Sequence, residues 1–269
     1  SLAKLKNSIR INLITPSLYC ESIPFRVLGV IPARYNSSRF QGKPLALIND
    51  IPMIKRTFEC AKKSKLLEKL IVATDSSKIK EYCEKENIPV VMTVDKHLTG
   101  TDRLTEIAQK EDYDFYVNIQ GDEPVIDSNC IDQLIEDFMA NHKKYSVYNL
   151  YKKIADDEDP DSDTIIKVVV NDQDELIYMS RRQVPFNKTD ETFSFHKQVC
   201  VYGFTKSALE SFMSKSKSRN ECSEDIEIVR FLDIGRPVKM LETTHSSIAV
   251  DVPKDILKVE KFLNENLLA

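Results

Sequence analysis

The sequence lacks features that mark several common protein classes. Its 269 residues contain no apolar run approaching the ~20 residues that a transmembrane helix needs. Lys and Arg total 38 against 42 Asp and Glu, a net charge of −4, so the basic balance of a nucleic-acid-binding protein is missing. We therefore expect no membrane span and no nucleic-acid partner.

Cysteine and histidine are few and scattered. The six cysteines form no CxxC pair, and the four histidines are dispersed along the chain. Neither pattern has the ligand spacing of a zinc site. Free thiols in a chain of this length are typical of a reducing compartment, so we expect a cytoplasmic protein.

The start of the chain differs from the rest. Its one apolar stretch, Ile11–Ile14, is too short and too polar for a secretory signal. We expect residues 1–25 to be a non-catalytic N-terminal extension, and residues 26–269 to form a single domain with a small lobe around 145–205.

Strand and helix patterns alternate in the first half of that domain. Short apolar runs typical of buried strands lie at 26–32, 69–75, 89–92 and 115–122. Helical periodicity fills the intervals at 52–65, 77–86, 101–110 and 128–141. This alternation predicts an α/β fold with a mostly parallel central sheet flanked by helices.

The second half has shorter elements. The predicted strands lie at 165–170, 175–180, 199–204 and 247–250. The predicted helices lie at 223–232 and from Pro253 onward.

Polar residues follow two of the predicted parallel strands. Thr74 and Asp75 end one strand, and Gln120, Gly121 and Asp122 end another. Because ligands bind at the carboxyl ends of parallel strands, both groups are expected to face one crevice.

A basic loop follows the first strand. Residues 32–45 carry Arg34, Arg39 and Lys43 with only one glycine. Clustered cations and loop amides suit a triphosphate, which needs about four charges neutralised. The loop is neither a Walker A motif nor a GxGxxG motif. A solvated basic loop is the alternative interpretation.

Two acidic residues have similar contexts. Asp122 follows an apolar strand, and Asp251 follows a predicted strand and precedes a helix that starts near Pro253. Carboxylates at strand ends suit Mg²⁺, which prefers oxygen ligands and keeps several waters. Each of them taken alone is equally consistent with a turn or capping role.

Several ordered motifs together resemble the 3-deoxy-manno-octulosonate (KDO) cytidylyltransferases. They lie at 30–45, 72–75 (VATD), 97–104 (HLTGTDRL), 118–124 (NIQGDEP), 180–181 with Pro185, and 250–253 (VDVP). The resemblance extends from about residue 26 to the end of the chain.

This resemblance implies a fold and an activity. The fold would be that of the nucleotide-diphospho-sugar transferases, with the 145–205 lobe serving dimerisation and sugar binding. The enzyme would be a nucleotidyltransferase that moves CMP from CTP to the anomeric hydroxyl of a 3-deoxy-ulosonic acid, releasing pyrophosphate, for lipopolysaccharide or capsule synthesis. It would use Mg²⁺ and form a homodimer.

The resemblance also implies roles for individual residues. The catalytic residues would be Arg34, Lys43 and Asp122. The nucleotide would be bound by Ala33, Arg34, Arg39, Lys43, Thr74, Asp75 and Gln120. The sugar would be bound by Gln120, Arg181, Gln198, Tyr202, Glu227 and Ile228. Asp122 and Asp251 would hold Mg²⁺.

The chain departs from the family pattern where the sugar is expected to bind. Gln198 stands where the family usually has a histidine, and Ile228 stands where it usually has a glutamine. Mismatched buried polar groups cost about 1–3 kcal/mol, so both changes alter substrate matching. The substrate is therefore either KDO itself or a modified KDO, such as the 8-amino-8-deoxy analogue.

Two further functions stay open. One is cytidylyl transfer to another acid sugar, such as a sialic acid, although the loop Asn36–Phe40 does not resemble the glycine- and serine-rich loop of that group. The other is a catalytically dead nucleotide-binding scaffold. Packing alone requires none of Arg34, Lys43, Asp122 and Asp251, which disfavours this second function.

Overall fold

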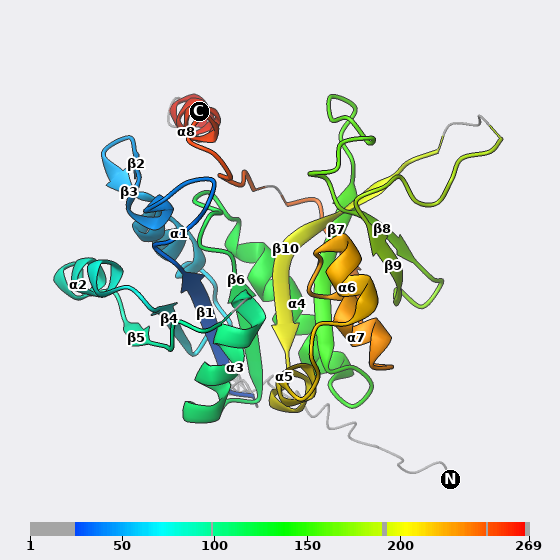
Figure 1. The fold of residues 1–269 in the computed structure, drawn as a ribbon, viewed down its shortest axis with the longest axis horizontal. Coiled ribbons are helices and arrows are strands. Elements are labelled where there is room, and N and C mark those ends of the chain that lie inside the picture. Colours follow the sequence, from blue (N-terminus) through cyan, green and yellow to red (C-terminus); the bar gives the residue numbers. More distant parts are fainter. Residues whose placement is uncertain (1–24, 98, 190–192, 246, 267–269) are drawn as a thin grey trace, which may run out of the picture.

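The computed structural model describes residues 25–97, 99–189, 193–245 and 247–266. These residues form a nine-stranded sheet with helices on both faces (Figure 1). The N-terminal extension predicted over 1–25 lies outside the described residues, apart from Phe25.

The centre of the sheet is parallel. Strand β1 (Val27–Ala33) lies between β4 (Lys69–Thr74) and β6 (Phe115–Ile119), and β5 (Val90–Met92) extends the sheet beyond β4. β1 and β6 are buried almost throughout because helices cover both faces. The carboxyl ends of these parallel strands lie at one edge of the sheet.

The other half of the sheet contains a reversed strand. β10 (His196–Phe204) runs antiparallel to β6 and to β7 (Val147–Lys153), and β11 (Lys239–Glu242) lies parallel to β7. The order is β11-β7-β10-β6-β1-β4-β5. This confirms the predicted fold class, an α/β protein with a mostly parallel central sheet.

A hairpin extends from the start of β10. Strands β8 (Lys167–Val170) and β9 (Leu176–Ser180) pair with each other, and β8 also pairs with β10. Figure 1 shows this hairpin beside the main sheet. It lies within the predicted 145–205 lobe, and the division into a domain and a lobe stays a prediction.

Helices cover the two faces of the sheet through separate apolar clusters. One cluster joins the sheet to α1 (Met53–Ala61), α2 (Ser77–Lys85) and α4 (Ser128–Asn141). The other joins it to α3 (Gly100–Lys110), α5 (Lys206–Met213) and α7 (Val229–Asp233), which α6 (Arg219–Glu224) precedes in the chain. Functional residues of α3 and of the α6–α7 region consequently share one face.

A third, smaller cluster lies at one end of the molecule. It joins Ile48 of the β2 (Leu47–Ile48) and β3 (Ile51–Pro52) hairpin to Met53, Val250 and Val259. Val259 belongs to α8 (Asp255–Asn266), and Phe40 of the basic loop packs against the same cluster. The basic loop and the segment before Asp251 therefore share one apolar support.

Two element predictions are wrong. Residues 247–250 form no strand, because the Val250 amide donates to the Asp122 carbonyl and the segment runs beside the end of β6. Residues 223–232 do not form one helix, because Asp225 adopts a left-handed conformation (φ 53°) that ends α6. Strands β7 and β11 and helix α5 were not predicted.

Candidate active site

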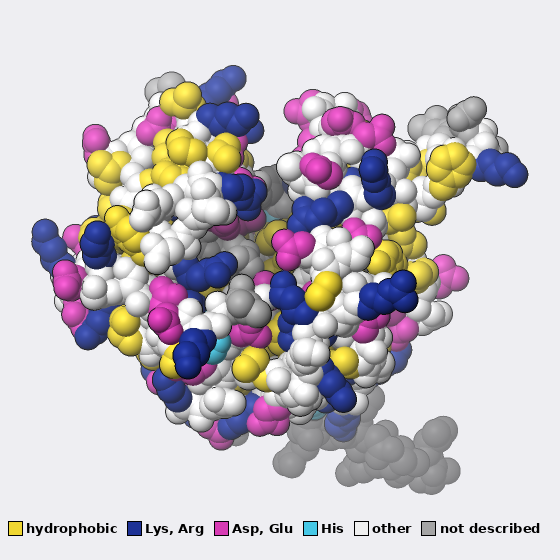
Figure 2. Space-filling model, in the orientation of Figure 1, with side chains coloured by type: hydrophobic (Ala, Val, Ile, Leu, Met, Phe, Trp, Pro, Cys, Tyr) yellow, Lys and Arg dark blue, Asp and Glu magenta, His cyan; other side chains and the backbone are white. Residues whose placement is uncertain are grey.

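A cleft of about 420 Å³ opens at the carboxyl ends of β1 and β6. Figure 2 shows this face hollowed, with basic and acidic side chains beside the hollow. The cleft is lined by Pro32, Ala33, Arg34, Asn36, Ser37, Ser38, Arg39, Lys43, Pro44, Thr99, Gly100, Arg103, Gln120, Gly121, Asp122 and Glu227.

The basic loop forms one wall of the cleft. The Gly42 amide donates to the Tyr35 carbonyl over 2.7 Å and closes the loop. Gly42 has φ 70°, a left-handed conformation that favours glycine, and it begins the short 3₁₀ helix η1 (Lys43–Leu45). This turn brings Lys43 to the same cleft as Arg34 and Arg39. The predicted clustering of the three cations is therefore present.

The turn after β6 touches the end of β1. A Cβ atom on Gly121 would lie 2.9 Å from the Pro32 carbonyl oxygen, so only glycine allows this close approach. The Thr57 hydroxyl donates to the Gly121 carbonyl over 3.1 Å and fixes the turn against α1. Gln120 and Asp122 are thereby held on the cleft wall.

Lys43 joins three segments that are distant in sequence. Its Nζ atom lies 2.7 Å from Asp122 Oδ2 and 2.9 Å from the Val250 carbonyl oxygen. The Val250 amide also donates to the Asp122 carbonyl over 2.9 Å. These contacts bring the basic loop, the β6 turn and the segment before Asp251 together at the cleft.

Asp251 lies at the rim of the cleft. Its Oδ1 atom is 3.2 Å from Arg39 Nη2. Burial, reinforced by the nearby carboxylates of Asp122 and Asp251, raises the pKa of Glu123 to about 7. Acidic groups therefore crowd this corner, which favours the binding of a cation.

The same corner can hold Mg²⁺ only when substrate phosphates and waters supply further ligands. Within the described ranges, no three His, Cys, Asp or Glu side chains cluster closely enough to hold a metal ion by themselves. A pair of carboxylates nevertheless suits Mg²⁺, because this ion keeps several waters and takes further ligands from substrate phosphates.

Glu227 belongs to the cleft wall beside the start of α3. Its Oε2 atom accepts a hydrogen bond from the Thr101 amide over 3.1 Å. A carboxylate at a helix N-terminus is stabilised by the unpaired amides there. Burial nevertheless raises the pKa of Glu227 above its usual value.

Arg103 lines the cleft although the sequence indicated only the start of a helix around it. It is almost fully buried, and its Nη2 atom lies 2.8 Å from Asp75 Oδ2. A second hydrogen bond joins it to Thr93. Asp75 thus holds the guanidinium of Arg103 in place at the cleft. The HLTGTDRL motif was the only sequence signal for Arg103.

The structure places the predicted site residues in two groups. Those that line the cleft are Ala33, Arg34, Arg39, Lys43, Gln120, Asp122 and Glu227. Among the described residues, those outside the cleft lining are Thr74, Asp75, Arg181, Gln198, Tyr202, Ile228 and Asp251. Of these, Asp251 reaches the rim through Arg39, and Asp75 acts on Arg103.

The remaining predicted sugar contacts have partners inside the protein. Arg181 donates to the carbonyl oxygens of Glu224 (2.7 Å) and Asp225 (3.2 Å). The side-chain amide of Gln198 donates from Nε2 to Asn149 Oδ1 over 3.0 Å. Ile228 is buried in an apolar cluster, and Tyr202 packs against that cluster. Their roles toward the sugar stay predictions.

Comparison with known proteins identifies the family to which this chain belongs. A family model described as cytidylyltransferase matches residues 28–243. The 3-deoxy-manno-octulosonate cytidylyltransferase of Fusobacterium nucleatum is 37% identical over 90% of this chain and 98% of its own length. The chain belongs to the 3-deoxy-manno-octulosonate cytidylyltransferase family. The resemblance and the nucleotidyltransferase class inferred from the motifs are confirmed.

Other members and structures agree with this assignment. The 8-amino-3,8-dideoxy-manno-octulosonate cytidylyltransferase of Shewanella baltica is 35% identical over 87% of this chain and 97% of its own length. The structure of CMP:2-keto-3-deoxy-manno-octonic acid synthetase complexed with CTP superposes with a TM-score of 0.85 at 30% identity, covering 90% of this chain and 99% of that chain.

Two other features of the described residues bear on the sequence-based expectations. None of the described helices has the length and apolar character needed to cross a membrane. The described cysteines, Cys60, Cys83, Cys130, Cys200 and Cys222, are all free thiols.

Proposed function

We propose that this family member transfers CMP from CTP to the anomeric hydroxyl of a KDO-type sugar acid and releases pyrophosphate. The observation that carries the proposal is the meeting of Lys43, Asp122 and the segment that precedes Asp251 at one cleft. Packing would not need this combination of charges, whereas a metal-assisted triphosphate site requires it.

The basic loop is suited to hold the triphosphate. Arg34 can bind phosphate oxygens with its planar guanidinium, and Lys43 can bind them as a point charge. Lys43 contacts Asp122, and Arg39 contacts Asp251. When phosphates take over as partners of these two cations, both carboxylates become available.

Asp122 and Asp251 would then hold Mg²⁺, which when bound supplies positive charge that offsets the charge of the phosphates. The acidic crowding around Glu123 supports this part of the proposal. Mg²⁺ dependence itself is part of the proposal.

The reaction forms one phosphorus–oxygen bond and breaks another. The anomeric oxygen attacks the α-phosphorus, and the bond from that phosphorus to the bridging oxygen of the β-phosphate breaks. The electron pair leaves with pyrophosphate, and the hydroxyl proton passes to solvent. The protein contributes orientation and fixed charges, with Gln120 and Glu227 on the cleft wall beside the phosphate-binding loop.

The identity of the sugar has two candidates. KDO is the substrate named for relatives such as the Fusobacterium protein, and the 8-amino sugar is the one named for the Shewanella protein. Gln198 and Ile228 are the observation that keeps the amino sugar as a second candidate, because both depart from the usual family pattern.

Pyrophosphate release tests the proposal. The full chain is incubated with CTP and Mg²⁺ plus KDO, its 8-amino analogue or a sialic acid, and UTP replaces CTP in a matched control. We expect release only with CTP and a KDO-type sugar. Faster release with KDO assigns the ordinary substrate, and faster release with the amino sugar assigns the second candidate.

Two results would contradict the proposed function. Faster release with the sialic acid would move the enzyme to another acid sugar. CTP-dependent thermal stabilisation without release from any sugar would favour the dead nucleotide-binding scaffold.

A homodimer and a cytoplasmic location belong to the same proposal. Exposed apolar side chains in the region of the β8–β9 hairpin support the dimer: Phe186 is 81% exposed, and Ile177 and Phe193 are 55% and 47% exposed. Size-exclusion chromatography with light scattering is expected to give twice the chain mass of 30.9 kDa. A single-chain mass across the micromolar range would contradict the dimer.

A further inference from the structure

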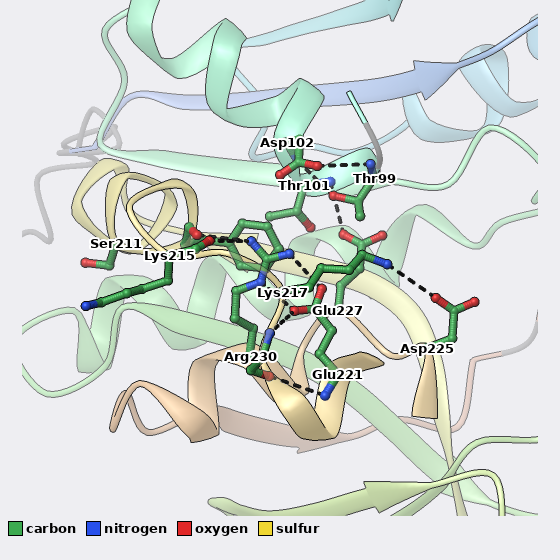
Figure 3. Close-up of polar contacts among 12 residues, drawn as sticks. Thr99, Thr101, Asp102, Ser211, Lys215, Lys217, Glu221, Asp225, Glu227 and Arg230 are labelled. Carbon is green, nitrogen blue, oxygen red and sulfur yellow. Dashed lines mark hydrogen bonds and ion pairs between the residues drawn. The ribbon is translucent and has the colours of Figure 1, made fainter. Parts of the chain in front are cut away.

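A charged pair is buried between α6 and α7, on the face of the sheet that carries Glu227. The side chains of Glu221 and Arg230 are 1% and 4% exposed, and Arg230 donates to both carboxylate oxygens at 2.6 and 2.7 Å. Figure 3 shows the two side chains pointing toward each other. An apolar pair would usually stabilise such a position at least as well.

Arg230 also ties the pair to α5. Its Nη1 atom donates to the carbonyl oxygens of Phe212 (3.1 Å) and Lys215 (3.2 Å). The guanidinium carbon lies 3.6 Å from the centre of the Phe212 ring. The end of α5 and the start of α7 are therefore fixed through one side chain.

Glu221 fixes the start of α6 in the same way. It forms a capping box with Ser218, whose amide donates to Glu221 Oε2 over 3.1 Å. The carboxylate that receives this bond also receives the guanidinium of Arg230. Both ends of the 221–230 segment are thus held by one buried contact.

Glu227 lies within this closed segment. The chain turns at Asp225, which has φ 53°, and the Arg230 amide donates to the Glu227 carbonyl over 3.1 Å. The Glu227 side chain then reaches the Thr101 amide at the start of α3 and lines the cleft. The backbone at Glu227 consequently depends on how residues 221 and 230 are held together.

We propose that Glu221 and Arg230 are positioning residues that hold Glu227 at the sugar-binding end of the cleft. The proposal rests on the proposed function and on the predicted role of Glu227 in binding the sugar acid. In some proteins a buried ion pair fixes one geometry without adding stability. Misplacing a contact by about 1 Å can cost up to a hundredfold in rate.

The main test replaces the pair by apolar residues of similar size, in the double variant Glu221→Leu with Arg230→Met. We expect a rise in the KM for the sugar of about tenfold, with the KM for CTP changed less than about twofold. Arg230→Lys provides a second variant, because it keeps the charge but loses the two-pronged contact. It is expected to change the sugar KM in the same direction.

A matched control separates positioning from stability. Phe138→Leu truncates a side chain in the apolar cluster on the opposite face of the sheet. It is expected to lower the melting temperature without changing the sugar KM. If the pair variants behave like this control, with a lower melting temperature and an unchanged sugar KM, the proposal is overturned.

Glu227→Gln tests whether the pair acts through Glu227. Because the pair acts through Glu227, combining Glu227→Gln with the double variant should raise the sugar KM less than the product of the separate effects. Independent multiplication of the two effects would count against the proposal. The unmodified protein is measured in the same assay. Absence of pyrophosphate release from it would refute the proposed function. Normal release from it, together with an unchanged sugar KM in the pair variants, would refute only the positioning role.

Discussion

Asp122→Asn is expected to reduce pyrophosphate release at saturating CTP and sugar by at least about a thousandfold, because it removes a negative charge that would hold the metal ion beside the phosphates. The fold should persist. Asp122 and Lys43 are 27% and 16% exposed, and a partly exposed pair of this kind contributes only about 0–1 kcal/mol to the free energy of unfolding.

Metal removal provides an internal check on this variant. Chelating Mg²⁺ should inactivate the unmodified enzyme but add little to the loss in Asp122→Asn, because both act on one site. Asp112→Asn is the matched control, since that carboxylate is 88% exposed and pairs at the surface with Lys206. Activity of Asp122→Asn within tenfold of the unmodified enzyme would show that Asp122 does not act in the reaction.

Lys43→Met is expected to lower kcat/KM for CTP by about 10²–10³-fold, an effect of the size seen when one charge-stabilising donor is removed. Methionine keeps most of the side-chain volume but loses the contacts to Asp122 and Val250. Initial rates across a range of CTP concentrations measure the effect.

The control for this variant keeps the same chemical change but moves it away from the cleft. Lys261 is 78% exposed and pairs with Glu265 on α8, so Lys261→Met should leave kcat/KM for CTP unchanged. If Lys43→Met retains normal kcat/KM for CTP, the basic loop does not bind the triphosphate as proposed.

The strand-end residues show what sequence reasoning could predict. Gln120 and Asp122 were placed correctly because a parallel sheet brings the ends of its strands to one edge, and the order of apolar runs indicated such a sheet. The basic loop was predicted from the clustering of Arg34, Arg39 and Lys43 in one segment. The same strand-end rule was wrong for Thr74 and Asp75, which lie outside the cleft lining.

Asp251 and Arg103 show where that reasoning ended. Asp251 was expected at the end of a strand, but its segment is held by the Val250–Asp122 contact, which joins residues far apart in sequence. Arg103 lies in a helical pattern beside Leu104, and only contacts with Asp75 and Thr93 show that it is buried at the cleft. Such pairings depend on tertiary packing that no local pattern records.

Arg181 illustrates a different limit. The motif predicted that it binds the sugar, and in the structure its guanidinium donates to carbonyl oxygens at the end of α6. A long cationic side chain can reach several partners from one backbone position. Sequence alone indicated the residue but not the partner that it selects.

The cluster that joins Ile48, Met53, Val250 and Val259 has a consequence for the order of folding. The basic loop lies near the start of the described residues, whereas its neighbour Asp251 and the supporting helix α8 lie far from it in sequence. Contacts of such large sequence separation form late, because the intervening chain must first be ordered. We therefore expect most of the sheet to form before this corner of the cleft, with α8 packed against it, is complete.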